Sequence, residues 1–185
     1  RRMVISPLWL QASLLTFVAG FAVLGILAVL IYRHEPPIPE RTVGPNGEVL
    51  FTGADIRAGQ GVFQKYGLMQ YGTLYGHGAY LGPDFTADYL HRQALLMQAL
   101  YQGETGPDSP AERVVRELQT NRYDAATGTL TFTRGQAHAF SELQRVYAAN
   151  LRNLRATGPL PAVYIKSPEE LRQLTAFFAW AAWTT

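Results

Sequence analysis

The sequence predicts a mainly α-helical chain in three parts. Residues 1–33 are expected to form a transmembrane helix, and residues 34–167 a helical domain outside the membrane with a small β-hairpin. Residues 168–185 are expected to begin a second transmembrane helix. Three observations lead to this prediction: a long apolar stretch near the start, repeated helix-capping sequences, and a second apolar run at the end.

The first apolar stretch runs from Met3 to Tyr32 and contains no charged side chain. A bilayer core about 30 Å thick needs ~20 apolar residues in a helix, so this stretch is long enough to cross it. Trp9 and Tyr32 stand at its two ends, where aromatic side chains favour the membrane interface. The alternatives are a signal peptide, whose apolar region is shorter at ~7–15 residues, and a buried helix of a soluble protein. We interpret the stretch as transmembrane.

The charges that flank this helix indicate its orientation. Arg1 and Arg2 precede it, whereas Arg33 at the other end is followed closely by Glu35. The positive-inside rule therefore favours an N-terminus in the cytoplasm. The residues after the helix would then face the periplasm.

A linker, a strand, a helix and a loop are expected next. Residues 35–45 contain four prolines and predict an extended linker. Residues 47–53 are bounded by glycines and predict a short strand, and residues 55–66 have apolar side chains at helical spacing. Residues 67–83 hold too much glycine for a regular element and predict a loop.

Four more helices are expected in the second half of the chain. Residues 86–102 carry an apolar stripe at helical spacing. Capping-box sequences then open three further helices, the second of which is expected to reach about residue 156. The boxes are Ser109–Glu112, Thr133–Gln136 and Ser167–Glu170.

The remaining elements are a strand and the final apolar run. Residues 129–133 alternate between apolar and polar side chains, and this strand could pair with residues 49–52. After the third capping box, residues 174–183 are almost entirely apolar and aromatic. We interpret this run as the first turns of a second membrane helix.

Composition excludes several kinds of site. The 185 residues contain no cysteine, which rules out disulfides, thiolate metal ligands and covalently attached haem. The net charge is only +2, and no basic run with interleaved aromatic side chains is present. A nucleic-acid partner is therefore not expected.

The histidines do not form a convincing metal site. No two of the four have the spacing that places two ligands on one face of a helix. Exposure or an ordinary hydrogen bond is the simpler interpretation for those on predicted helices, and the first should lie at the membrane interface. The histidine in the glycine-rich loop is the one worth testing, although it could merely fill space. They are His34, His77, His91 and His138.

Three carboxylates near the predicted helix 86–102 allow two interpretations. Asp84 and Asp88, with Glu104, could be paired for acid–base catalysis. Negative charge at a helix N-terminus also complements the helix dipole, and we favour that interpretation.

The glycine- and aromatic-rich stretch from Gly59 to Thr86 carries the strongest signal. A mono-haem cytochrome would have its C-x-x-C-H attachment motif here. In this chain Leu68 and Tyr71 stand in place of the two cysteines, and Gly72 in place of the histidine. The stretch from Leu68 reads LMQYGTLYGHGAYLGP, and residues 76–92 read GHGAYLGPDFTADYLHR.

These motifs resemble the quinol-dependent nitric oxide reductases of bacteria, in which a haemless cytochrome-c-like domain precedes the catalytic membrane domain. Cytochrome-dependent relatives carry a separate small chain that reads CMxCHTLxGxGAYxxP in the same stretch. The resemblance covers residues 7–185 and implies a cytochrome-c-like fold for the domain. Leu68, Tyr71 and Gly72 would then form a degenerate haem c site.

The resemblance also implies an activity for the full protein. It would reduce two NO to N2O and water with electrons from quinol, using two haems b and a non-haem iron. Its partners would be the haem-copper-oxidase-like catalytic membrane domain, in the same or a companion chain, together with quinol and membrane lipid, and a homodimer could form. The protein would lie in the bacterial inner membrane with this domain in the periplasm. The segment itself would be a structural cap without a redox centre, catalytic residue or cofactor of its own.

A calcium site is the one ligand function that the resemblance assigns to residues of this chain. Calcium accepts carbonyl and hydroxyl oxygen ligands. In relatives, the glycine carbonyl and tyrosine hydroxyl of the GAY motif bind a calcium ion that bridges haem propionates. Gly78 and Tyr80 are the matching residues, and the other ligands would come from the rest of the protein.

A domain that has lost its haem should refill the space, since a cavity costs ~24 cal/mol per Å³. We expect bulky side chains of the same stretch to do so. They are Tyr66, Leu68, Tyr71, Tyr75 and Tyr80.

Two alternatives come from other functional classes. The periplasmic ligand-sensing domain of a membrane receptor has the same plan and would bind its ligand in the vacated haem cavity. A membrane-anchored electron-carrier cytochrome is the other, but the absence of cysteine and Gly72 at the iron-ligand position argue strongly against it.

Overall fold

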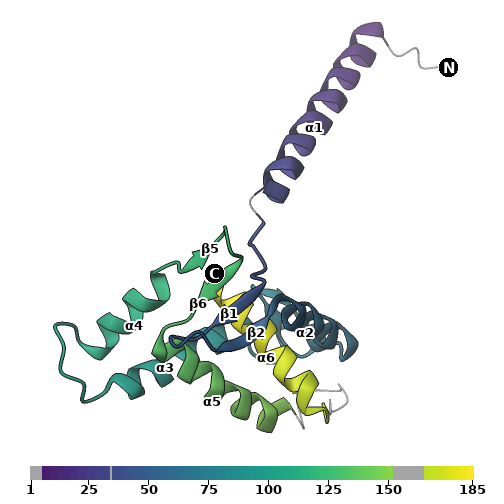
Figure 1. Ribbon diagram of the computed structural model, residues 1–185. Helices are drawn as coiled ribbons and strands as arrows, with labels where there is room; N and C mark the ends of the chain where they lie inside the picture. The colour runs from purple at the N-terminus through teal and green to yellow at the C-terminus, as the bar shows by residue number, and fades with distance from the viewer. Residues whose placement is uncertain (1–5, 34, 152–164) are drawn as a thin grey trace. The chain divides into compact units, whose positions relative to one another are not determined.

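The structure is a computed structural model that describes residues 6–33, 35–151 and 165–185. The described chain is mainly helical and divides into two compact units, one ending at Pro37 and the other beginning at Ile38 (Figure 1). This confirms a mainly α-helical chain with a long N-terminal helix.

The first unit is a single helix, α1 (Pro7–Arg33), as the apolar stretch predicts. Its 27 residues include none that is buried, so leucine, valine and phenylalanine side chains are exposed on every side. Pro7 is compatible with the first turn, and the Ser6 Oγ accepts a hydrogen bond from the Trp9 N–H at 3.4 Å. Within the described residues, α1 is the one helix long and apolar enough to cross a membrane.

The α-helices of the second unit begin at polar caps. The predicted boxes at α4 and α5 are confirmed, with Ser109 and Glu112 exchanging hydrogen bonds before α4 and Thr133 and Gln136 before α5. The expected end of the second boxed helix near residue 156 lies outside the described residues. The helices are α2 (Gly53–Lys65), α3 (Phe85–Tyr101), α4 (Pro110–Gln119), α5 (Arg134–Leu151), α6 (Pro168–Trp183) and the short 3₁₀ helix η1 (Leu68–Gln70).

A four-stranded sheet replaces the expected hairpin. Its strand order is β2-β1-β6-β5, so β6 lies parallel to β1 and not beside β2. The predicted pairing of residues 129–133 with 49–52 is therefore wrong. The error arises because β1 lies between these two strands, in a segment that the sequence predicted to be a linker. The prolines at 39 and 45 flank β1 and do not interrupt it, so its N–H groups remain available for pairing. The strands are β1 (Arg41–Val43), β2 (Val49–Thr52), β5 (Tyr123–Asp124) and β6 (Thr129–Thr131).

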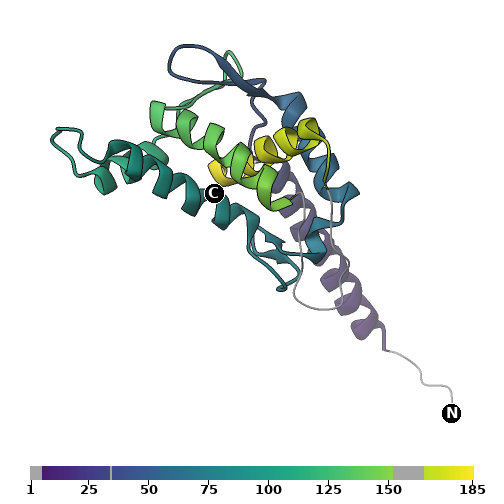
Figure 2. The same cartoon turned by 90° about the horizontal axis from the view of Figure 1, so that it is seen from below.

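Helix α6 lies at the centre of the second unit, where it packs against α2, α3 and α5 (Figure 2). The approach to α2 is close because Gly59 has no side chain: a Cβ there would lie 2.0 Å from the Gln173 carbonyl oxygen and 2.8 Å from the Phe177 Cβ. The apolar run that suggested a membrane segment is thus buried within the domain. A second transmembrane helix beginning here stays a prediction.

Aromatic side chains fill the core around Phe178, which is fully buried. Its ring stacks on Phe85 with centroids 5.1 Å apart and meets the ring of Tyr147 at 5.4 Å. Phe63 on α2 contacts both of these phenylalanines edge-on. Rings from α2, α3, α5 and α6 therefore hold the helices together and position the loop between α2 and α3.

Candidate functional site

The loop between α2 and α3 contains the positions that correspond to a haem attachment motif. Leu68 is fully buried in the main hydrophobic core, and Tyr71 is nearly so. Gly72 is also buried, and a Cβ there would lie 2.3 Å from the Pro83 carbonyl oxygen and 2.9 Å from the Phe85 ring. The residues at these positions do not fit a covalently attached haem, because none can form a thioether bond.

A small hairpin, β3 (Thr73–Leu74) and β4 (His77–Gly78), forms within the predicted loop. Tyr75 and Gly76 at its turn both have positive φ, at 52° and 76°. Two residues with positive φ are the requirement of the type I′ turn, which matches the twist of a hairpin. The many glycines of this stretch predicted an irregular loop, so the hairpin was not expected from the sequence.

Asp84 fixes the hairpin to the start of α3. Its carboxylate accepts hydrogen bonds from the Thr73 hydroxyl at 2.6 Å, the Gly76 N–H at 2.7 Å and the Ala87 N–H at 2.9 Å. Burial alone would raise the pKa of Asp84, but these hydrogen bonds outweigh it and hold the pKa below its ordinary value. The interpretation of Asp84 as a helix N-terminal charge is correct, since it is the N-cap of α3.

Gly78, an expected calcium ligand, is the last residue of β4, and Tyr80, the other one, follows the hairpin two residues later. Gly78 has a φ of 139°, and a Cβ on it would lie 2.4 Å from the Gly72 carbonyl oxygen. The backbone therefore requires glycine at this position, with or without an ion. Tyr80 is 88% exposed, so within the described chain its side chain contributes little to packing and its hydroxyl faces solvent.

These two residues offer one carbonyl and one hydroxyl oxygen, whereas calcium takes 6–8 oxygen ligands. Within the described residues, no group of three or more histidine, aspartate or glutamate side chains could hold a metal ion. The pair fits part of a calcium site that other segments would complete. Whether an ion binds there stays a prediction.

The side chains expected to refill a haem cavity differ in how far they are buried. Leu68 and Tyr71 are buried as expected, whereas the expectation for Tyr80 is wrong because it is exposed. Tyr66 is half-buried and donates a hydrogen bond to Glu170 at 2.9 Å. The partly exposed Tyr75 shares a 2.6 Å hydrogen bond with Thr184. The centre of the domain is instead filled by the phenylalanines around Phe178.

The other singled-out side chains do not come together. The described histidines His77, His91 and His138 are all exposed, so His77 does not fill a cavity; His34 lies outside the described residues. Asp88 accepts hydrogen bonds from Arg92 and Tyr147. Glu104 pairs with Arg113 and Arg134, far along the chain from both aspartates. The paired-carboxylate alternative has no support.

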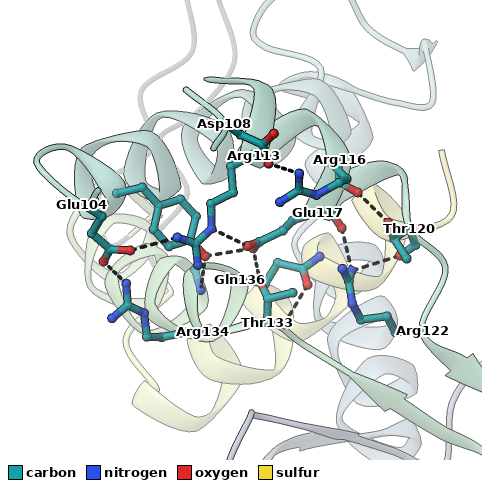
Figure 3. A network of polar contacts seen from close by, with 12 residues as sticks. Glu104, Asp108, Arg113, Arg116, Glu117, Thr120, Arg122, Thr133, Arg134 and Gln136 are labelled. Atoms are coloured by element: carbon teal, nitrogen blue, oxygen red, sulfur yellow. Dashed lines mark hydrogen bonds and ion pairs between the residues drawn. The ribbon is translucent and has the colours of Figure 1, made fainter. Parts of the chain in front are cut away.

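Sequence reasoning missed a buried polar network that joins α3, α4 and α5 (Figure 3). The Glu117 carboxylate accepts hydrogen bonds from the Tyr101 hydroxyl at 2.8 Å and the Arg113 Nε at 3.0 Å, and from Thr133. The Arg113 guanidinium lies over the Tyr101 ring at 3.7 Å. Burial would raise the pKa of Glu117, but Thr133, Arg113 and Tyr101 together hold it below its ordinary value. The i,i+4 spacing of Arg113 and Glu117 is the feature of the sequence that could have indicated an ion pair here.

This network is satisfied internally. Tyr101 also accepts a hydrogen bond from the Gly135 N–H at 3.0 Å, which connects α3 to the first turn of α5. Its acids and bases are engaged with one another, so the arrangement holds the helices in place and leaves no free nucleophile or base among them.

The comparison with protein families agrees with a cytochrome c-like domain. No match is found among curated protein sequences. A family profile for the cytochrome c-like domain of NorB, a component of nitric oxide reductase, matches residues 39–185, which is most of the chain and nearly the whole second unit. The chain therefore belongs to the NorB family of nitric oxide reductases, through its cytochrome c-like domain.

Proposed function

We propose that the chain is the N-terminal part of a quinol-dependent nitric oxide reductase. The full protein would catalyse 2 NO + QH2 → N2O + H2O + Q, in which quinol supplies both the two electrons and the two protons. Two haems b and a non-haem iron, bound elsewhere in the protein, would supply the redox chemistry. The observation that carries the proposal is the family match over residues 39–185 in a chain without cysteine.

The lack of cysteine bears on the electron donor. A cytochrome c-like domain passes electrons from a soluble donor only if it holds a haem, and covalent attachment needs two cysteines. Positions 68 and 71 are leucine and tyrosine, and both side chains are buried in the core. Electrons would therefore reach the catalytic domain directly from quinol in the membrane.

The domain would act as a cap on the catalytic membrane domain, in the same polypeptide or a companion chain. The fully exposed apolar α1 supports anchoring in lipid. The charges around α1 favour an N-terminus in the cytoplasm, which would place this domain in the periplasm of a bacterium whose inner membrane holds the reductase. A homodimer is compatible with this arrangement.

Gly78 and Tyr80 would contribute oxygen ligands to a calcium ion at the contact with the catalytic domain. The exposed Tyr80 hydroxyl supports this role, because an 88% exposed aromatic side chain gains little from its own domain. The hairpin turn and the Asp84 hydrogen bonds would hold both residues in a fixed arrangement. The remaining ligands would come from outside this chain.

The proposed activity is tested on the full-length protein in detergent. We expect a haem b spectrum without haem c, together with NO consumption that depends on added quinol. A covalent haem stain, or NO consumption driven only by a reduced soluble cytochrome, would refute the quinol assignment. Absence of both haem and NO consumption would favour the ligand-sensing alternative.

The calcium ligand is tested by Tyr80→Phe in the same preparation. After chelation and washing, we expect the variant to retain less calcium and less haem b than the wild type. Tyr75→Phe is the matched control, because the Tyr75 hydroxyl is already bonded to Thr184 within the same domain. Equal calcium and haem retention in all three proteins would exclude Tyr80 as a ligand.

A further inference from the structure

A pocket of about 520 Å³ lies in the second unit, away from the degenerate haem motif. Its walls come from α3, α4, the start of α5 and the C-terminal end of α6, and none of its lining residues belongs to the stretch 66–80. This volume is within the range of ~300–1,000 Å³ that small-molecule sites occupy. The proposed reductase function gives this pocket no role.

The lining is uncharged and largely apolar. Leu90, Phe132, Ala179 and Trp183 contribute apolar surface, and no lysine, arginine, histidine, aspartate or glutamate lines the pocket. A charged ligand would lose its hydration there without gaining an ionic partner. The lining therefore selects a neutral molecule, and the Trp183 ring offers a face for stacking.

Gln93 is the unusual member of this lining. Its side chain is only 4% exposed, yet its amide forms no hydrogen bond with any side chain or backbone group that the structure describes. Its nitrogen and oxygen are not among the fully buried side-chain atoms that lack a partner, so the amide is open to the space of the pocket. A leucine of similar size would give this wall no hydrogen-bonding group. The amide therefore offers a donor and an acceptor to a molecule bound in the pocket.

Gln136 adds a second unused donor to the same pocket. Its Oε1 accepts the Thr133 N–H at 2.9 Å in the capping box of α5 (Figure 3). Its Nε2 group has no acceptor within the described part of the chain, and the residue lines the same space. Gln119 and Asn121 also line it, so four amide side chains and an uncharged, largely apolar wall border one pocket.

We propose that this pocket binds a neutral, flat ring compound that carries a carbonyl or similar acceptor oxygen. The ring lies against Trp183 and the apolar wall, and the acceptor oxygen receives hydrogen bonds from the amides of Gln93 and Gln136. This site is independent of the proposed calcium ligands and of the source of electrons. It is a feature of the domain's own α3, α4, α5 and α6.

The test uses the full-length protein in lipid nanodiscs, with protein-free nanodiscs as the reference for partition into lipid. The probes are 6-fluorocoumarin, which has a ring carbonyl, and 2-fluoronaphthalene, which has a similar ring system and no acceptor. Binding is measured from ¹⁹F line broadening. Gln93→Leu should weaken coumarin binding about tenfold, as expected for one or two lost hydrogen bonds, and leave naphthalene binding unchanged or tighter.

Two further variants test whether the probes bind in this pocket. Val115 lines the pocket and is 52% exposed, so Val115→Trp should narrow it and weaken both probes severalfold without disturbing the core. Leu95 on α3 is also 52% exposed but does not line the pocket, so Leu95→Trp is the matched control. Equal binding to all variants would show partition into lipid only and would overturn the proposal.

Thermal unfolding separates a binding role from a structural one. Without ligand, Gln93→Leu should leave the Tm of the domain unchanged or raise it, since the amide forms no hydrogen bond with the described residues. A fall in Tm would mean that the protein itself uses the amide, and it would overturn the proposal. Failure of 6-fluorocoumarin to bind the wild-type protein would also overturn it.

Discussion

Helices α1 and α6 are both rich in apolar residues, but α1 is exposed and α6 is mostly buried. Each begins with Ser-Pro and continues into apolar and aromatic residues. In α1 none of 27 residues is buried, whereas α6 buries nine of its 16, including both phenylalanines. Apolar composition therefore does not by itself assign a helix to the membrane. The distinguishing features are length and the charged first turns of α6, where Glu170 and Arg172 pair with α2.

The sharpest test of this difference is the same substitution in both helices. Phe178→Ala should lower the free energy of unfolding of the domain by about 3–5 kcal/mol, because it leaves a cavity among the rings of four helices. Phe21→Ala in α1 should leave it unchanged within error. Urea unfolding in detergent micelles, followed by tryptophan fluorescence, measures both, since Trp180 and Trp183 lie in α6. Equal effects would refute the separation of the two units.

Glycine-to-alanine substitutions provide the next comparison between the two helical environments. Gly59→Ala should cost about 1–3 kcal/mol or more, since its Cβ would overlap the Gln173 carbonyl and α6 would have to move. Gly61 is on the same helix with nothing within 4 Å, and Gly61→Ala should stabilise by about 0.5–1 kcal/mol. Gly20→Ala in α1 also meets nothing within the described chain and should not affect the domain. A similar loss at positions 59 and 61 would exclude close helix packing as the cause.

The order of the helices could be read from the sequence because its signals are local. The caps at Ser109 and Thr133 and the apolar spacing of α2 and α3 depend on neighbouring residues only. The strand pairing failed because β1 is a short strand, Arg41–Val43, and its partner β6 lies far along the chain at Thr129–Thr131. The position of α6 could not be inferred either, because it depends on the close approach at Gly59, a contact between distant segments.

The candidate site was predictable in part for the same reason. The burial of Leu68 and Tyr71 was expected from the motif around them, and Asp84 was correctly read as a helix N-terminal charge. The exposure of Tyr80 could not be read from a glycine-rich loop whose hairpin turn was not recognised. The unpartnered amide of Gln93 is invisible in a sequence, because its lack of a partner is a property of packing.

A smaller effect is expected at the serine that precedes each helix. Ser167→Ala removes the hydroxyl that accepts the Glu170 N–H at 3.3 Å and should lower the free energy of unfolding by about 1 kcal/mol. Ser6→Ala removes the matching cap of α1, but a helix in lipid keeps its backbone hydrogen bonds, so we expect no change. The same urea titration measures both. A comparable loss at position 6 would mean that α1 unfolds together with the domain.

The smallest expected effect is that of acidic pH, which should weaken the ion pairs between α6 and α2 and leave α1 unchanged. Hydrogen bonds from Lys65 and Tyr66 lower the pKa of Glu170 below its ordinary 4.5. Burial would raise the pKa of Asp55, but its hydrogen bonds with Arg172 and Thr52 hold it below 3.8. A lowered folded-state pKa gives stability that is present above the ordinary value and is lost as pH falls through the folded value.

The domain should therefore lose stability as pH falls below about 4, by a small amount because these pairs are partly exposed. Arg172→Gln removes the partner of Asp55, so its deficit relative to the wild type should be largest at neutral pH and should shrink in acid. Arg145→Gln is a suitable control, since Arg145 is more exposed and its ion pair with Glu142 lies within α5. The helix content of α1 should not respond, because Pro7–Arg33 contains no aspartate or glutamate. A constant deficit from pH 7 to 3 would show that Arg172 stabilises α6 by packing of its side chain and not by its charge.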